Sequence, residues 1–284
     1  MLLHAPAKLN LCLYLGAPRE DGLHELCSLF EPLALADGIE VSEADRDEVI
    51  CPGVEGENLA ARALAGLRKR GWEGPPLRIE VEKRIPVAAG LGGGSADAAA
   101  VLRLAREPAT GVAGSVPDLE ELAAELGADV PSQLVPSLAL VRGAGERVAR
   151  LPDPEPHAVV LLPGGGGLST AEVFAEADRL GLGRSAEQLE ALAQRLLTAA
   201  GAGASPLDYV ELLENDLEPA ARSLRPDVGE ALGALREAGA PLVLLTGSGP
   251  TAFGLFADLA AAREAAGRID RDDAIVCEAG ASAE

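Results

Sequence analysis

Apolar residues near the start of the chain recur at every second position. Leucine occupies each odd position from Leu9 to Leu15, and polar Asn10 lies between two of them. A period of two is typical of a β-strand with one buried face, so the pattern predicts a half-buried strand over 5–15. Similar apolar runs predict further strands over 30–42, 47–51 and 77–84.

Stretches rich in Ala, Leu and charged residues alternate with these strands. They predict helices over 57–71, 95–106 and 118–126. The segment LPDPEP at 151–156 then interrupts the pattern, because proline removes a backbone donor and disfavours helix before it. We place a domain boundary there. The predicted domains are residues 1–152 and 153–284.

The second half of the chain again mixes strands and helices. The run PLVLLTGSGPTAFGLF at 241–256 predicts two strands joined by a glycine turn. The other predicted elements are a strand over 157–163, several helices between 169 and 238, a helix over 258–268 and a strand over 274–278.

Composition narrows the class of protein. Of 284 residues, 48% are apolar but only seven are aromatic, so a core of Leu, Val and Ala is expected. The formal charge of -21 disfavours binding to nucleic acid or to an anionic membrane. No apolar run approaches the roughly 18 residues of a membrane span.

The cysteines show neither paired spacing nor a neighbouring histidine cluster. Buried thiols in a reducing compartment are therefore expected rather than disulfides or a zinc site, which predicts a cytoplasmic protein. The four cysteines are Cys12, Cys27, Cys51 and Cys277.

Lysine is rare: only Lys8, Lys69 and Lys83 stand among 24 basic residues. A site that needs one compact positive charge would favour lysine over arginine. A solvated surface position is the alternative interpretation for each.

The stretch PVAAGLGGGSADAAA at 86–100 lies between a predicted strand and a predicted helix, with Ser95 or Asp97 as candidate helix cap. Glycines let the backbone approach a ligand, and the free N–H groups of the next helix attract anions. The stretch is neither a Walker A loop nor a Rossmann fingerprint. It predicts a phosphate-binding loop, with a plain linker as the alternative.

Two other loops have simple structural interpretations. In LGADVPSQL at 126–134, Gly127 ends a predicted helix, and Asp129 by itself is interpreted as a turn or cap residue. TGSGP at 246–250 by itself is interpreted as a hairpin turn.

Taken together, these loops resemble the GHMP family of small-molecule kinases. PVAAGLGGGSADAAA resembles the family's phosphate-binding motif, and TGSGPTAFG its C-terminal motif. APAKLNLCLYLGAPREDGLHEL at 5–26 is similar to the opening of those GHMP kinases that phosphorylate 4-diphosphocytidyl-2-C-methyl-D-erythritol in the non-mevalonate isoprenoid pathway. The resemblance extends over about 5–256 through ENLAARA, LGADVP, GAGERV, LSTAEVF and ENDLEP.

The resemblance implies an α+β fold of two domains. The N-terminal domain would be mixed α/β with a glycine-rich phosphate loop, and the C-terminal domain would be ferredoxin-like. The implied reaction transfers the γ-phosphoryl group of ATP, with Mg²⁺, to the 2-hydroxyl of a small cytidyl-diphosphate substrate. A monomer or weak homodimer is expected.

The family motifs also assign residues. Asp129 would accept the proton of the hydroxyl, and Lys8 would stabilise the carboxylate and the transferring group. Thr170 and Phe174, four apart on a predicted helix, would face the cytidine. Other implied substrate contacts are Asn10, Leu23, His24, Gly247 and Gly249. The implied ATP contacts are Asn58, Lys83, Pro86, Ala88, Ala89, Gly90, Leu91, Gly92, Gly93, Gly94 and Ser95, with Ser95 as candidate Mg²⁺ ligand.

Two departures from the family pattern bear on the substrate. Leu23 in DGLH replaces a tyrosine that would stack on the cytosine, so weaker cytidine recognition is expected. The stretch 132–137 also differs, which predicts an altered substrate-side wall. A GHMP kinase for another alcohol, and a non-catalytic nucleotide or metabolite sensor on the same fold, are the alternatives.

Overall fold

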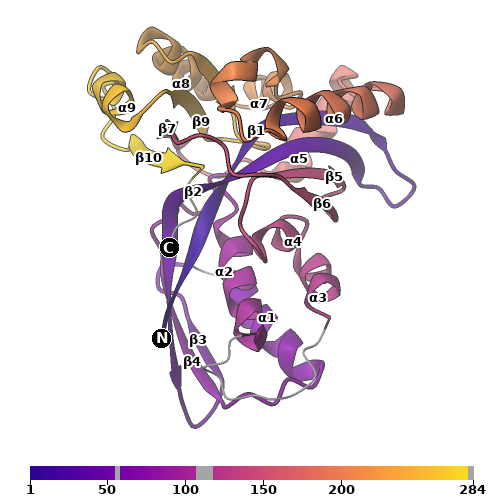
Figure 1. The fold of residues 1–284 in the computed structure, drawn as a ribbon, viewed down its shortest axis with the longest axis vertical. Helices are drawn as coiled ribbons and strands as arrows, with labels where there is room; N and C mark the ends of the chain where they lie inside the picture. Colours follow the sequence, from indigo (N-terminus) through magenta and orange to yellow (C-terminus); the bar gives the residue numbers. More distant parts are fainter. Residues whose placement is uncertain (55–57, 107–117, 281–284) are drawn as a thin grey trace.

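Two long antiparallel strands connect the two lobes of the molecule. The computed structural model describes residues 1–54, 58–106 and 118–280. Strands β1 (Leu2–Pro18) and β2 (His24–Glu43) pair along nearly their whole length and run through both lobes (Figure 1). The predicted strand over 5–15 is confirmed.

The prediction that β1 is half-buried is wrong, because residues 5–16 are buried on both faces. Loops distant in the sequence cover the second face. The backbone N–H of Lys8 donates to the carbonyl of Leu91 at 2.9 Å, and that of Asn10 donates to Thr246 Oγ1 at 3.0 Å. The polar side chains of β1 therefore lie beneath two glycine loops.

The N-terminal lobe packs helices against one part of the sheet. Its helices are α1 (Leu59–Lys69), α2 (Gly93–Arg103), α3 (Leu119–Leu126) and the short α4 (Val130–Gln133). Its further strands are β3 (Glu48–Ile50), β4 (Leu77–Glu82), β5 (Ala139–Gly143) and β6 (Arg147–Arg150). The first three helices were predicted, whereas β5 and β6 were not. Residue 57, where the first helix was predicted to begin, lies outside the described residues.

The C-terminal lobe has the β-α-β-β-α-β order of a ferredoxin-like fold. Its antiparallel sheet has the order β10-β7-β9-β8, and the predicted hairpin of β8 and β9 is confirmed. The strands are β7 (His157–Leu162), β8 (Leu242–Leu245), β9 (Ala252–Phe256) and β10 (Ile275–Ala279). The helices are α5 (Thr170–Leu180), α6 (Ala186–Ala200), α7 (Glu218–Leu224), α8 (Pro226–Glu237) and α9 (Leu259–Ala266).

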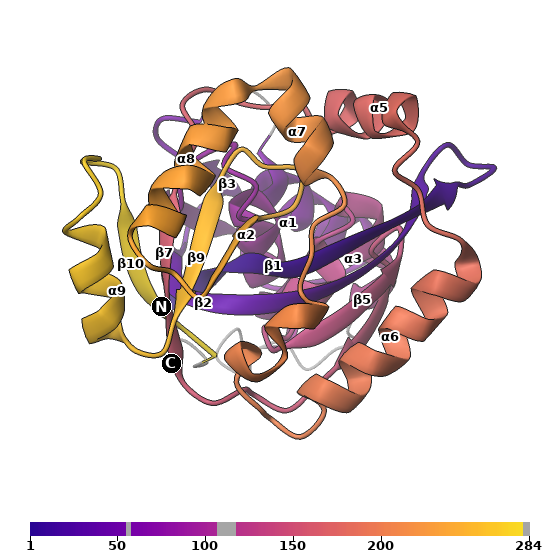
Figure 2. The ribbon, with the colours of Figure 1, turned by 90° about the horizontal axis from the view of Figure 1, so that it is seen from above.

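The two lobes share one sheet, because Ala279 of β10 pairs with Leu33 of β2. The segment 151–156, where we placed the domain boundary, connects β6 to β7. Seen from above, α5 and α6 lie on either side of the β1–β2 hairpin (Figure 2). This arrangement brings α5 close to the residues at the hairpin tip.

The core is built mainly from Leu, Val and Ala, as the composition predicted. Cys12 and Cys27 are buried, Cys51 and Cys277 are half-buried, and all four are free thiols. Among the helices of the described residues, none is both long and apolar enough to cross a membrane.

Candidate active site

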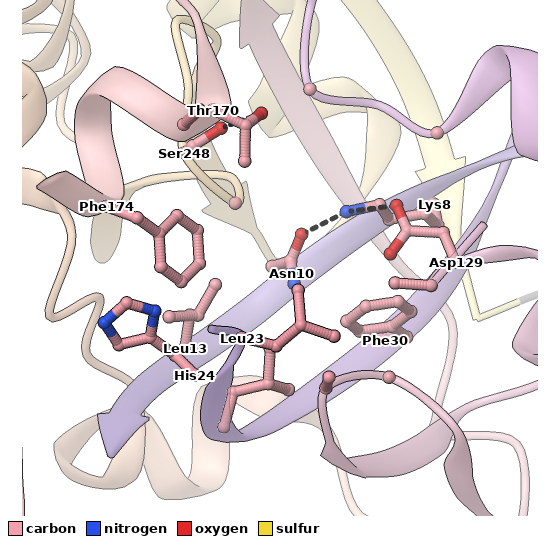
Figure 3. A pocket seen from close by; sticks show the side chains of 18 of the residues that line it. Lys8, Asn10, Leu13, Leu23, His24, Phe30, Asp129, Thr170, Phe174 and Ser248 are labelled. Carbon is pink, nitrogen blue, oxygen red and sulfur yellow. Dashed lines mark hydrogen bonds and ion pairs between the residues drawn. The ribbon is translucent and has the colours of Figure 1, made fainter. Parts of the chain in front are cut away.

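Two cavities meet at the glycine loop. One has a volume of about 710 Å³ and the other about 300 Å³, and Gly90 and Gly92 line both. The larger cavity, part of which Figure 3 shows, is bordered by β1, the β1–β2 hairpin, α5 and the loop after β8. The smaller cavity lies between the glycine loop and the start of α1. A group that crosses from one cavity to the other must pass the glycine loop.

The glycine loop leaves the start of α2 open. The helix begins at Gly93, and its cap is Gly92, with a φ of 69° and no side-chain hydrogen bond. A capping role for Ser95 or Asp97 is therefore wrong, because both already lie inside the helix. An uncapped first turn keeps N–H groups available for an anion at the positive end of the helix dipole.

Two of the glycines permit close packing that no other residue would allow. Gly92 has a positive φ, and a Cβ there would lie 2.8 Å from Cγ of Lys8. Gly90 also has a positive φ, and its Cβ would lie 2.7 Å from the carbonyl oxygen of Gly249. The loop is thereby held against β1 on one side and against the loop after β8 on the other.

Lys8 and Asp129 form an ion pair in the wall of the larger cavity. Lys8 Nζ lies 3.3 Å from Asp129 Oδ2 and donates a hydrogen bond to Asn10 Oδ1 (Figure 3). The lysine side chain is 8% exposed and the aspartate side chain 31%, so both line the cavity and the carboxylate is the more open of the two. The interpretation of Asp129 as a turn or cap residue is confirmed for its position, because it lies in a turn at the cap position of α4, but its side chain makes no capping hydrogen bond.

The loop after β8, which carries the C-terminal motif TGSGPTAFG, contacts Asn10, and Asn10 in turn contacts Lys8. Asn10 Nδ2 donates to Ser28 Oγ at 2.9 Å, which fixes the side-chain oxygen toward Lys8. A Cβ on Gly247 would lie 3.2 Å from that oxygen. Gly247 lines the larger cavity, whereas Gly249 lines neither and packs its carbonyl against Gly90.

The far end of the larger cavity is built by the hairpin tip and α5. The ring of His24 lies 5.0 Å from that of Phe174, tilted by 51°, and His24 Nε2 lies 2.8 Å from Asp178 Oδ1. Thr170 Oγ1 shares a hydrogen bond with Ser248 Oγ at 3.0 Å. Sequence reasoning missed Asp178 and Ser248. Asp178 follows Phe174 by four residues, a helical spacing that could have revealed it.

Leu23 lines the same end and is 54% exposed. The predicted change in the substrate-side wall is wrong, since residues 132–137 line neither cavity. That wall is formed by Ala128, Asp129, Ala144 and Gly145 instead.

All residues assigned to ATP lie in the lining of the smaller cavity, but two of them already have protein partners. Lys83 Nζ donates to Asp37 Oδ2 and, at 2.8 Å, to Asp97 Oδ2. Burial disfavours the charged lysine, but the two carboxylates outweigh this and raise the pKa of Lys83. Asn58 caps α1 by accepting the N–H of Ala60 at 2.8 Å. Their contact with a nucleotide stays a prediction.

Burial raises the pKa of Asp97 to about 6, although the positive charge of Lys83 by itself would lower this pKa. Its Oδ1 is buried and has no hydrogen-bond partner among the residues that the structure describes. Asp37 accepts the backbone N–H groups of Arg84 and Ile85, at 2.6 and 2.8 Å. The cluster of Asp37, Lys83 and Asp97 therefore ties the residues before the glycine loop to the helix after it.

The oxygen donors near the loop suit Mg²⁺ that arrives with a nucleotide. Across residues 1–54, 58–106 and 118–280, no group of three or more His, Cys, Asp or Glu side chains could hold a metal ion. Ser95 and Asp97 both line the smaller cavity, where Ser95 offers a hydroxyl, whereas the carboxylate of Asp97 is buried and bonded to Lys83. Mg²⁺ commonly takes one or two protein oxygens and its other ligands from phosphates and water, which this donor set fits.

Comparison with known proteins places these features in a family. The model of the GHMP kinase N-terminal domain matches residues 58–136, and that of the C-terminal domain matches residues 186–273. A 4-diphosphocytidyl-2-C-methyl-D-erythritol kinase of Streptomyces avermitilis is 40% identical over 253 residues, covering 87% of this chain and 84% of that protein. One of Pelotomaculum thermopropionicum is 40% identical over 277 residues, covering 95% and 93%.

A solved structure shows the same similarity over the whole chain. A crystal structure of 4-(cytidine 5'-diphospho)-2C-methyl-D-erythritol kinase matches with a TM-score of 0.81 and 36% identity, covering 99% of this chain and all of that one.

Proposed function

Because this chain belongs to the 4-diphosphocytidyl-2-C-methyl-D-erythritol kinase family of the GHMP kinases, we propose that it phosphorylates the 2-hydroxyl of that cytidyl compound. The chain is an ATP-dependent phosphotransferase with an alcohol acceptor. The observation that carries the proposed acceptor chemistry is the Lys8–Asp129 pair, which opens into the larger cavity beside glycines that also line the smaller one.

In this proposal Asp129 is the general base. A hydroxyl is a weak nucleophile, and a carboxylate within hydrogen-bond reach can accept its proton as the bond to phosphorus forms. The ammonium group of Lys8, 3.3 Å away, holds the carboxylate in position at the wall of the cavity. The proton moves from the hydroxyl oxygen to the carboxylate of Asp129. The oxygen forms the new bond to the γ-phosphorus, the bond from that phosphorus to the β–γ bridging oxygen breaks, and ADP leaves.

The glycine loop and Lys8 stabilise the transferring group. The uncapped N-terminus of α2 supplies N–H donors for the phosphates, and Lys8 lies against Gly92 of the same loop. Mg²⁺, when bound with ATP, neutralises charge on the β- and γ-phosphates. Ser95 is the proposed ligand for it from the protein, with Asp97 nearby.

The far end of the larger cavity would take the cytidine. Phe174 offers one aromatic face, and Leu23 offers an aliphatic surface in place of the usual tyrosine. Leucine recovers part of the stacking energy through apolar contact, so the base is held less tightly but still bound.

The test is ATP turnover with Mg²⁺ and one acceptor at a time. The acceptors are 4-diphosphocytidyl-2-C-methyl-D-erythritol, mevalonate, homoserine and galactose. Turnover of the cytidyl compound alone supports the proposal, and turnover of another alcohol instead assigns a different substrate. ATP binding without turnover of any acceptor would indicate a sensor and contradict the proposal.

A further inference from the structure

The segment 214–216, which begins the motif ENDLEP, runs beside β1. The backbone N–H of Leu13 donates to the carbonyl of Glu214 at 2.8 Å, and the N–H of Asp216 donates to the carbonyl of Leu13 at 2.9 Å. These two bonds form a parallel bridge between Leu13 and Asn215. The backbone of Asn215 is therefore fixed to β1.

The side chain of Asn215 holds the loop after β8. Its Nδ2 donates to the carbonyl oxygens of Leu245 at 2.6 Å and Gly247 at 2.8 Å, and its Oδ1 accepts the N–H of Leu217 at 2.9 Å. Because a carbonyl only accepts and a backbone N–H only donates, one orientation of the amide alone satisfies all three bonds. Leu245 and Gly247 are buried, so their carbonyl groups depend on Asn215 rather than on bulk water for this hydrogen bond.

The two carbonyl groups flank Thr246, which contacts Asn10. The backbone N–H of Asn10 donates to Thr246 Oγ1 at 3.0 Å, and that hydroxyl donates to Asn10 Oδ1 at 3.4 Å. Gly247 lies against the same oxygen, because a Cβ there would be 3.2 Å from it. Asn10 Oδ1 also accepts the hydrogen bond of Lys8, which pairs with Asp129 (Figure 3). An unbroken series of contacts therefore connects the ENDLEP segment to the ion pair.

Asn215 acts on the site from outside it, since it lines neither cavity. We propose that Asn215 is a positioning residue: it fixes the loop after β8 so that the Lys8–Asp129 pair keeps the geometry that phosphoryl transfer requires. A displacement of a catalytic group by about 1 Å can cost on the order of 100-fold in rate, so a hydrogen bond away from the substrate is able to control the rate. This inference rests on the proposed roles of Lys8 and Asp129, but not on which alcohol is the acceptor.

The next residue, Asp216, provides a matched control. Its carboxylate accepts two hydrogen bonds from Arg184, at 2.6 and 2.7 Å, and the N–H of Leu15 at 2.9 Å. Like Asn215, it ties the segment to β1. Its side-chain partners in the part of the chain that the structure describes lie in β1 and just before α6, not in the loop after β8. Asp216→Asn should therefore affect stability without moving that loop.

The first test follows Lys8 without any substrate. The chain has three lysines, so lysine labelled with ¹³C at Cε gives three side-chain signals, and the signal missing in Lys8→Arg is that of Lys8. Lys8 Nζ lies 4.7 Å from the centre of the Phe30 ring, whose ring current displaces the resonance of the adjacent methylene group. Asn215→Asp keeps the shape of the side chain but removes the donor, and we expect it to move this signal. Asp216→Asn should leave the signal unchanged.

The second test measures the reaction. For Asn215→Asp we expect the single-turnover rate to fall roughly tenfold, the scale of one lost hydrogen bond. The affinity for ATP should stay within about twofold, because neither Asn215 nor Thr246 lines the smaller cavity. Asp216→Asn should keep both values.

Thr246→Val supplies a second variant if Asn215→Asp does not fold. It removes only the hydroxyl and should lower the rate by a similar factor, whereas Thr246→Ser keeps the hydroxyl and should restore most of the rate. Because both residues act through the same contacts, the double variant of Asn215→Asp and Thr246→Val should lose little more than the larger single loss.

The outcomes separate this inference from the proposed function. If another alcohol is the acceptor, the proposed function fails, and the rate with that alcohol tests Asn215. If no acceptor is phosphorylated, the signal of Lys8 alone decides. An unmoved Lys8 signal in Asn215→Asp, or in Thr246→Val, would overturn the inference. Equal losses of rate in Asn215→Asp and Asp216→Asn, or additive losses in the double variant, would likewise contradict it.

Discussion

Lys8 Nζ lies 3.3 Å from Asp129 Oδ2 across a sequence separation of 121 residues, and both line the larger cavity. The stem of the lysine passes over Gly92, whose missing Cβ leaves the room it needs. The Lys8–Asp129 pair and the glycine loop are thus one packed unit. A change in the loop should therefore disturb the pair as well as nucleotide binding.

Gly92→Ala tests this coupling. The left-handed backbone of Gly92 costs an alanine about 1 to 2 kcal/mol, and the new Cβ would displace the stem of Lys8. We expect kcat/KM for ATP to fall at least roughly tenfold and kcat to fall as well, as measured by steady-state kinetics. Gly71→Ala is the matched control, because Gly71 also has a left-handed backbone with a φ of 85°, a Cβ there would meet nothing within 4 Å, and the residue lines neither cavity. If both variants behave alike, the steric coupling is wrong.

Leu23→Tyr should strengthen binding of the cytidyl substrate. Stacking on an aromatic ring is worth about 1 to 3 kcal/mol per base, of which leucine recovers a part. We expect the KM for this substrate to fall roughly fivefold while the KM for ATP stays unchanged. The alternative that Tyr209 already supplies the second ring is wrong, because Tyr209 is 3% exposed and packs in the core. An unchanged KM would show that Leu23 does not contact the base.

His157 should make the stability of the fold depend on pH. Its Nδ1 faces the carbonyl oxygen of Glu155 at 3.0 Å and its Nε2 faces Glu31 Oε2 at 3.2 Å. A protonated ring can donate to both of these oxygens at once, whereas a neutral ring can donate to only one. Burial disfavours that charge, but Glu31 outweighs it and raises the pKa of His157.

A raised pKa in the folded state stabilises the protein below the unfolded pKa, and this stabilisation is lost as the pH rises through the folded pKa. Urea unfolding of the unmodified protein and of His157→Gln should therefore give a larger difference in the free energy of unfolding at pH 6 than at pH 8.5. The comparison cancels the titration of other groups. A difference that grows with pH would mean that His157 is neutral in the fold.

The parts of the candidate site that are formed by residues close together in the chain could be predicted, because a short run of residue types indicates their structure. Glycines between a strand and a helix predicted the phosphate loop at 86–100, and the glycine turn predicted the hairpin of β8 and β9. The strands β5 and β6 were missed. β5 pairs with residues 26–30 of β2, a partner so distant in the sequence that no local pattern indicates it, and β6 pairs only with β5.

Features that depend on distant residues could not be predicted. The leucine pattern of β1 identified a strand but gave no sign that loops near residues 91 and 246 bury its other face. The two carboxylates on Lys83 come from positions 37 and 97. The contact between Asp178 and His24 required the hairpin tip and α5 to meet, although the helical spacing of Asp178 from Phe174 was visible in the sequence.

The central claim is that Asp129 accepts the proton of the acceptor hydroxyl. The direct measurement is the rate of phosphoryl transfer to the cytidyl substrate in a single turnover, for the unmodified protein and for Asp129→Asn, with ATP binding measured in parallel. Asparagine keeps the size of the side chain but cannot take the proton, so the rate should fall roughly 100-fold or more while ATP binding stays unchanged. A rate within a few-fold of that of the unmodified protein, in a folded variant that binds ATP normally, would contradict the claim.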